Sequence, residues 1–128
     1  MHHRTTTCFL CGDVMTGRGI DQIMPQPSQP DIYEGYMRSA KGYVELAEQA
    51  NGAIEQPVDY PYIWGDALNI LQQEAPQVRL VNLETAVTTS DDYWRGKGIN
   101  YRMHPDNIRC LKAADIQCCA RRGVYDSG

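Results

Sequence analysis

Apolar positions follow two kinds of pattern along this chain. Residues 7–12 and 78–83 are short, nearly continuous apolar runs, which is typical of strands buried on both faces of a parallel sheet. A third, shorter strand is predicted over residues 115–119. Between these segments apolar residues recur three or four positions apart, the spacing of one helix face. Helices are therefore expected over residues 34–50, 61–75 and 105–114.

The order of strand, helices, strand, helix and strand predicts an α/β fold with a mostly parallel sheet and flanking helices. Residues 25–31 carry three prolines, and residues 85–98 are polar and contain glycine, so both are expected to be loops. A short extended piece is expected at 99–103. With 128 residues the chain is expected to form a single domain, residues 1–128.

The charge balance excludes one class of function. The formal net charge is −4, which argues against non-specific nucleic-acid binding because that needs clustered Lys and Arg. No apolar run approaches the ~20 residues that cross a bilayer, so no transmembrane segment is expected. The apolar stretch after residue 7 is too short for a signal peptide, and a cytoplasmic location is therefore predicted.

Five cysteines raise the question of a metal site or a disulfide. An odd number cannot pair completely within the chain. Cys8 and Cys11 have C-x2-C spacing and Cys118 adjoins Cys119, so zinc has to be considered. However, a strand sends Cys8 and Cys11 to opposite faces of the sheet. We expect reduced cysteines that are buried in core strands.

Acidic residues follow two of the predicted strands, where ligands bind in parallel α/β sheets. Asp13 comes after the first strand and Glu84 after the second. The loop around Arg18 lacks the Lys-Ser or Lys-Thr of a phosphate-binding P-loop. Asp13 and Glu84 therefore favour one or two divalent metals, with Arg18 facing an anionic substrate. A purely structural role, as caps of the following turns, is the alternative for both acids.

Several segments together resemble the bacterial CapA family, the poly-gamma-glutamate capsule synthesis proteins. They are FLCGDVMTGRGIDQIM, YIWGDALNILQQ, VRLVNLETAVTTSDDYWRGKGINYRM and AADIQCC, and the resemblance runs over roughly residues 8–128. It implies a calcineurin-like metallophosphoesterase fold, a four-layer α/β/β/α sandwich with metal ligands at strand ends. It also implies a hydrolase-like protein of capsule or exopolymer polyglutamate production, often at the cell envelope.

The resemblance assigns roles to four residues. Asp13 of the GD motif and Glu84 of the NLE motif match metal-ligand positions, which implies a divalent metal such as Mn, Zn or Mg. Arg18 and Asn82 match residues that line the site and bind substrate. The implied partner is an anionic small molecule, or polyglutamate or another capsule precursor.

One departure from the family pattern bears on activity. The family carries a motif like A-N-N-H-x-x-D-x-G after the third strand, and here Arg121, Arg122 and Gly123 replace Asn, Asn and His. Guanidinium groups have no lone pair with which to ligate a metal. The later strands and their metal-binding histidines are also absent, and His2, His3 and His104 do not replace them. We expect an incomplete CapA-like domain with weak or no activity.

Two alternatives of a different class stay open. In the first alternative, the chain is a non-catalytic binding module. Asp13 and Glu84 then pair with Arg121 and Arg122, and an aromatic groove binds an anionic polymer. In the other it is a fragment without independent function that self-associates through an open sheet edge. The contacts expected in the groove are Tyr93, Trp94, Arg95 and Lys97.

Overall fold

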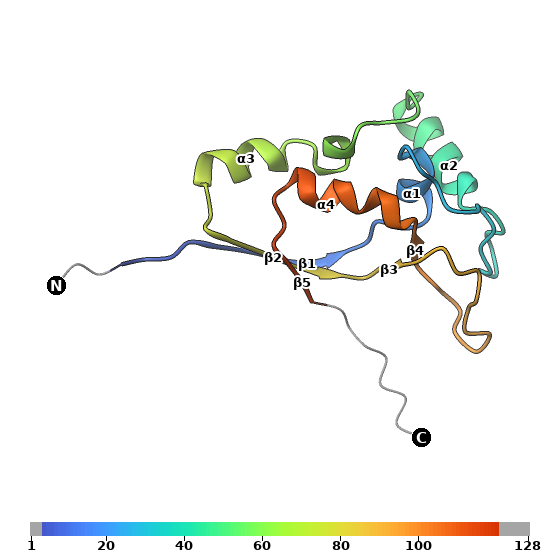
Figure 1. Cartoon of the computed structure of the whole chain (residues 1–128). Helices are drawn as coiled ribbons and strands as arrows, with labels where there is room; N and C mark the ends of the chain where they lie inside the picture. Colours follow the sequence, from blue (N-terminus) through green and yellow to red (C-terminus); the bar gives the residue numbers. More distant parts are fainter. Residues whose placement is uncertain (1–3, 121–128) are drawn as a thin grey trace, which may run out of the picture.

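The computed structural model describes residues 4–120 of the chain. Its main sheet has three parallel strands in the order β1-β2-β5. The helices lie on one side of this sheet (Figure 1). The predicted α/β class, with a parallel sheet and flanking helices, is therefore confirmed. The strands are β1 (Cys8–Val14), β2 (Val78–Leu83) and β5 (Cys118–Ala120).

Two smaller features complete the element order. A parallel pair of two-residue strands, β3 (Ala86–Val87) and β4 (Arg102–Met103), extends beyond the end of β2. Two 3₁₀ helices, η1 (Tyr60–Trp64) and η2 (Pro105–Ile108), precede α-helices in the chain. The α-helices are α1 (Gly19–Ile23), α2 (Lys41–Asn51), α3 (Ala67–Glu74) and α4 (Arg109–Ala113).

Helix boundaries differ from the sequence prediction in two places. The helix expected over 34–50 begins only at Lys41, because residues 31–39 form an extended turn closed by a β-bridge between Asp31 and Ser39. The helix expected over 61–75 divides at Gly65, whose φ of 49° lies in the left-handed region that favours glycine. The short helix α1 was not predicted, because its five residues are too few for a periodic apolar pattern.

The core lies between the main sheet and the helices. Val81 and Leu83 of β2 point to this side and are almost completely buried. Arg79, on the same side, donates hydrogen bonds to the backbone carbonyls of Leu71 and Ala114, which ties β2 to the ends of α3 and α4. The buried cluster consists of Ile23, Met24, Val44, Val58, Leu83, Met103, Cys110 and Leu111.

The opposite face of the main sheet is exposed in the described part of the chain. Leu10 of β1 is 71% exposed and Val78 of β2 is 38% exposed. The prediction that the strand cysteines are buried is wrong for Cys8, Cys118 and Cys119, which are exposed free thiols. For Cys8 and Cys118, which lie on the open face, sequence alone could not show this, since an apolar run does not tell whether one or both faces of a strand are covered. Cys119 aligns with Val81 on the helix side, but it belongs to the edge strand β5 and is exposed there.

Among residues 4–120, no helix has the length and apolar character that a membrane crossing requires.

Candidate functional site

The two acids at the strand ends lie on either side of one amide group. Asp13 is at the end of β1, and Glu84 directly follows β2. The side-chain Nδ2 of Asn82 donates a hydrogen bond to Asp13 Oδ1 at 2.7 Å and another to Glu84 Oε1 at 3.0 Å. Three of the four residues singled out from sequence therefore meet at the carboxyl edge of the sheet.

A β-bulge brings Asp13 to this position. Cys11 pairs with Val81, but the next aligned pair is Val14 with Leu83. Gly12 and Asp13 on β1 therefore stand opposite a single residue, Asn82, on β2. Bulges of this kind redirect a side chain and are frequent beside functional sites. The bulge therefore places the Asp13 side chain on the same side of the sheet as the Asn82 amide.

The chemistry of these side chains fits a hard divalent cation. Two carboxylates and one carboxamide are the oxygen donors that Mg²⁺ and Mn²⁺ accept, with water for the remaining positions. Within residues 4–120, however, no cluster of three or more His, Cys, Asp or Glu side chains forms, so these residues do not make a complete metal site by themselves. His104 has a structural role instead, since its Nδ1 accepts a hydrogen bond from the backbone N–H of Asp106 at the start of η2.

The ion pair of Arg18 is with Glu34 rather than with Asp13 or Glu84. Its Nε donates to Glu34 Oε1 at 2.6 Å, and its guanidinium lies over the rings of Tyr43 and Tyr101 at 4.8 and 4.7 Å from the centroids. Burial alone would lower the pKa of Arg18, but the hydrogen bond and charge of Glu34 outweigh it and raise the pKa. The guanidinium of Arg18 is therefore held in place and positively charged. The backbone of Arg18 has a φ of 52°, an uncommon value for a residue with a side chain.

Glu34 connects Arg18 with Tyr43, a role that the sequence did not predict. It is only 2% exposed, and it accepts hydrogen bonds from Arg18 and from the hydroxyl of Tyr43. Burial and the bond to Glu34 raise the pKa of Tyr43, so this hydroxyl stays a donor at neutral pH. The Nη2 of Arg18 is buried and has no hydrogen-bond partner within the described residues. The site thus contains one arginine donor that nothing described here uses.

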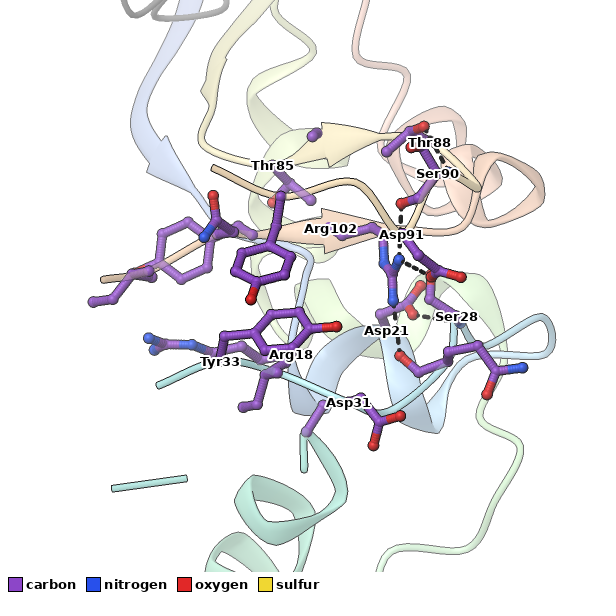
Figure 2. A pocket seen from close by; sticks show the side chains of 18 of the residues that line it. Arg18, Asp21, Ser28, Asp31, Tyr33, Thr85, Thr88, Ser90, Asp91 and Arg102 are labelled. Carbon is purple, nitrogen blue, oxygen red and sulfur yellow. Dashed lines mark hydrogen bonds and ion pairs between the residues drawn. The ribbon is translucent and has the colours of Figure 1, made fainter. Parts of the chain in front are cut away.

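Arg18 and Glu84 share the lining of an open cavity of about 740 Å³. The cavity lies between the loop that precedes α2 and the loop that connects β3 with β4 (Figure 2). The rings of Tyr33 and Tyr93 stack across these two loops, with centroids 3.6 Å apart and planes 10° apart. Trp94, which also lines the cavity, is 55% exposed.

The groove contacts expected from sequence are found in part. Tyr93, Trp94 and Lys97 line the cavity, whereas Arg95 is not among its described lining residues. The 85–98 segment is largely without regular structure, as predicted, apart from the short strand β3, and it is exposed mainly from residue 89 onward.

Polar contacts hold the two loops at the cavity together. Arg102 pairs with Asp91 and donates to the backbone carbonyls of Ser90 and Gln29, which links the two loops (Figure 2). Asp21 is 1% exposed and accepts hydrogen bonds from the backbone of Ser28 and His104 and from the side chain of Asn107. The bonds from Arg102 to Gln29, and from His104 and Asn107 to Asp21, join positions 73 to 86 residues apart, so no local pattern could have indicated them.

Five residues named in the sequence analysis lie outside the residues that the structure describes. They are His2, His3, Arg121, Arg122 and Gly123. The expected pairing of Asp13 and Glu84 with the two arginines therefore stays a prediction.

Comparison with known proteins shows the protein family to which this chain belongs. The family model described as "Bacterial capsule synthesis protein PGA_cap" matches residues 7–121, which is most of the chain. The chain belongs to this family, as its sequence motifs indicated.

Two similar proteins come from Mycobacterium tuberculosis, strains CDC 1551 / Oshkosh and ATCC 25618 / H37Rv. Each is called a probable polyglutamine synthesis accessory protein and is 50% identical to this chain over 114 residues. The aligned part is 89% of this chain, but the chain spans only 30% of the length of these relatives. No solved structure shows a significant match.

Proposed function

We propose that this chain carries part of the binding site of a capsule or polyglutamine synthesis accessory protein, built around a divalent cation. Asp13 and Glu84 are the proposed cation ligands. The observation that carries the proposal is that both carboxylates accept hydrogen bonds from the same Asn82 amide nitrogen. Two separate strands thus aim negative oxygens at one point, which a cation satisfies better than an amide does.

Asn82 has a defined part in this proposal. Its amide donates to both acids, so without a cation it separates two like charges. Rotation of the carboxamide by half a turn presents its oxygen in place of its nitrogen and adds a third ligand. A divalent cation bound there attracts the phosphate or carboxylate group of a capsule precursor as a Lewis acid. Arg18 and the neighbouring cavity bind the remainder of that molecule.

We further propose that this chain by itself has little or no hydrolytic activity. The support is the replacement of the family's Asn-Asn-His by Arg121, Arg122 and Gly123, which removes side chains able to ligate a metal or transfer a proton. Hydrolysis of bis-p-nitrophenyl phosphate with added Mn²⁺ tests this part. Turnover that is robust and abolished by EDTA would contradict it.

Cation binding itself is tested by titrating Mn²⁺ and counting free ion by electron paramagnetic resonance. We expect one bound ion per chain, with affinity lowered at least about tenfold in Asp13→Asn and in Glu84→Gln. Glu45→Gln is the matched control, because Glu45 is an exposed carboxylate in the middle of α2. Equal Mn²⁺ affinity in the unmodified chain, the two variants and the control would show that Asp13 and Glu84 are not the ligands.

A second candidate function is a non-catalytic binding module. The observation that favours it is the aromatic lining of the cavity, with the Tyr33–Tyr93 stack and the exposed Trp94. Absence of Mn²⁺ binding together with binding of a polymer would favour this reading over the first.

The main sheet also offers two edges for self-association, β1 and β5 in the order β1-β2-β5. Unpaired edge strands can add a strand of another copy. Sedimentation equilibrium of the whole chain tests this, with a concentration-independent monomer as the contradicting result.

A further inference from the structure

The cavity between the two loops has an aromatic part that is open to solvent. The rings of Tyr33 and Tyr93 stack across the loops, and Tyr33 is 47% exposed. Trp94, the next residue after Tyr93, also lines the cavity and is exposed. Stacking covers only one face of each tyrosine ring, so Tyr33 and Trp94 keep ring surface that a ligand can contact.

Two carboxylates accompany these rings. Asp31 lies two residues before Tyr33, Asp92 directly precedes Tyr93, and all four residues line the cavity. The ring stack therefore joins two loops that each carry an acid beside the ring. Within residues 4–120 neither carboxylate forms an ion pair, not even with Lys97 of the same lining.

The charge of the whole lining favours a cation over an anion or a neutral chain. The described lining has six acids, which are Asp21, Asp31, Glu34, Glu84, Asp91 and Asp92, and three bases, which are Arg18, Lys97 and Arg102. Acids still outnumber bases when Glu84 is set aside as a ligand of the proposed divalent cation. A polyanion is repelled by this field and a neutral chain gains little from it, whereas a cation is attracted.

The same cavity already holds one organic cation in a matching environment. The guanidinium of Arg18 pairs with Glu34 and lies over the rings of Tyr43 and Tyr101. One carboxylate and two tyrosine rings thus surround a cation of this chain. The exposed part of the cavity offers the same kinds of group, carboxylates beside aromatic rings, to a cation from outside.

We propose that Asp31, Tyr33, Asp92, Tyr93 and Trp94 bind a small linear polyamine, and we call this set of residues the amine subsite. The ammonium groups pair with the two carboxylates, and the methylene segments between them pack on the aromatic rings. Two acids on separate loops favour a ligand with at least two ammonium groups. The cavity volume of about 740 Å³ lies in the range of small-molecule sites.

The amine subsite goes beyond the proposed function, because it does not depend on a divalent cation at the strand ends. It also departs from the expectation from sequence that an anionic polymer occupies the aromatic groove. The ligand is recognised by its positive charges and by the apolar segments between them.

Isothermal titration calorimetry of the whole chain tests the proposal. The probe is spermidine in metal-free buffer at low ionic strength, and the uncharged comparison is tetraethylene glycol. We expect saturable binding of one spermidine per chain and at least tenfold weaker binding of the glycol. Absence of saturable spermidine binding at millimolar concentration, or equal binding of the two compounds, overturns the proposal.

A matched pair of double variants locates the charges that matter. Asp31→Asn/Asp92→Asn should weaken spermidine binding at least tenfold. Glu45→Gln/Glu74→Gln removes two negative charges from exposed positions on α2 and α3 outside the cavity lining, and it should weaken binding less than twofold. Equal weakening in both double variants would show that spermidine responds only to the net charge of the chain, and would overturn the amine subsite.

An aromatic substitution tests whether the rings take part. Trp94→Ala should weaken spermidine binding at least threefold. Tyr62→Ala should leave it unchanged, because Tyr62 is a similarly exposed aromatic residue on η1 outside the cavity lining. An inorganic cation held by the acids alone would not need Trp94. An unaffected Trp94→Ala variant therefore overturns the polyamine assignment.

A peptide of equal charge separates a small polyamine from a basic protein segment. Acetyl-trilysine-amide carries three ammonium groups, as spermidine does, and should bind more weakly because its backbone amides must also be desolvated. Tighter binding of the peptide would overturn the polyamine assignment. Because these titrations contain no divalent metal and the Mn²⁺ titration contains no amine ligand, each proposal can fail while the other stands.

Discussion

The two faces of the main sheet differ sharply although they belong to the same three strands. On the helix side, Val81 and Leu83 are 0% and 5% exposed, and Arg79 is anchored to the ends of two helices. On the other side, Leu10 is 71% exposed and Cys8 and Cys118 are exposed thiols. The difference teaches that the helix-covered face holds the described fold together, while the open face contributes little to its stability.

The candidate cation site belongs to the open side of this comparison. Val78, Leu80 and Asn82 alternate with the buried Val81 and Leu83 along β2, so the Asn82 amide points away from the core. The bulge in β1 then places Asp13 next to that amide. The site is thus built from side chains that the core does not need. Substitutions there should change binding more than stability.

The largest expected contrast is between two acids, one on each side. Asp21→Ala should lower the free energy of unfolding by about 4 kcal/mol, because it leaves the N–H groups of Ser28 and His104 and the Asn107 amide without their acceptor. Asp13→Ala removes an exposed side chain and should cost less than about 1 kcal/mol. Urea unfolding followed by circular dichroism measures both, and similar losses would contradict the comparison.

The second contrast uses one substitution on both faces. Leu83→Ala should destabilise the protein by about 3 kcal/mol, since it opens a cavity in the buried cluster. Leu10→Ala should change the stability by about 0.5 kcal/mol or less, because its side chain is already in water. A large loss for Leu10→Ala would show that another surface covers this face in solution.

The smallest contrast concerns thiols at alkaline pH. Burial raises the pKa of Cys110 from 9.0 to about 11, so the folded state favours the neutral thiol. This contribution is complete below pH 9 and is lost as the pH rises towards 11, at a cost of up to about 2 kcal/mol. The free energy of unfolding is measured with urea at pH 8 and at pH 10.5. Its decrease between these two pH values should be smaller in Cys110→Ala than in the exposed-site control Cys8→Ala. Equal differences would contradict the assignment.

The fold was largely predictable from sequence because its signals are local. The runs at 7–12 and 78–83 became β1 and β2, and the periodic segments gave α2, α3 and α4, with shifted starts. The start of α2 was missed because the bridge between Asp31 and Ser39, which is a tertiary feature, overrides helix propensity in the residues before Lys41.

The site was predictable where it follows from topology. Parallel strands end at the same edge, so Asp13 and Glu84 had to be neighbours once β1 and β2 were paired. Glu34, Asp21 and Arg102 were missed because their partners lie on other segments of the chain. The sequence placed Arg18 opposite an anionic substrate but did not indicate that Glu34 is its counter-charge.

The central claim is that Asp13 and Glu84 converge on one cation position that the Asn82 amide occupies when no cation is bound. Nuclear magnetic resonance of chain labelled with ¹⁵N-asparagine tests it directly during a Mg²⁺ titration. We expect the side-chain NH₂ signals of Asn82 to shift and saturate with Mg²⁺, while those of exposed Asn69 on α3 stay in place. Asn82 signals that remain unmoved at millimolar Mg²⁺, or that shift no more than those of Asn69, would contradict the account.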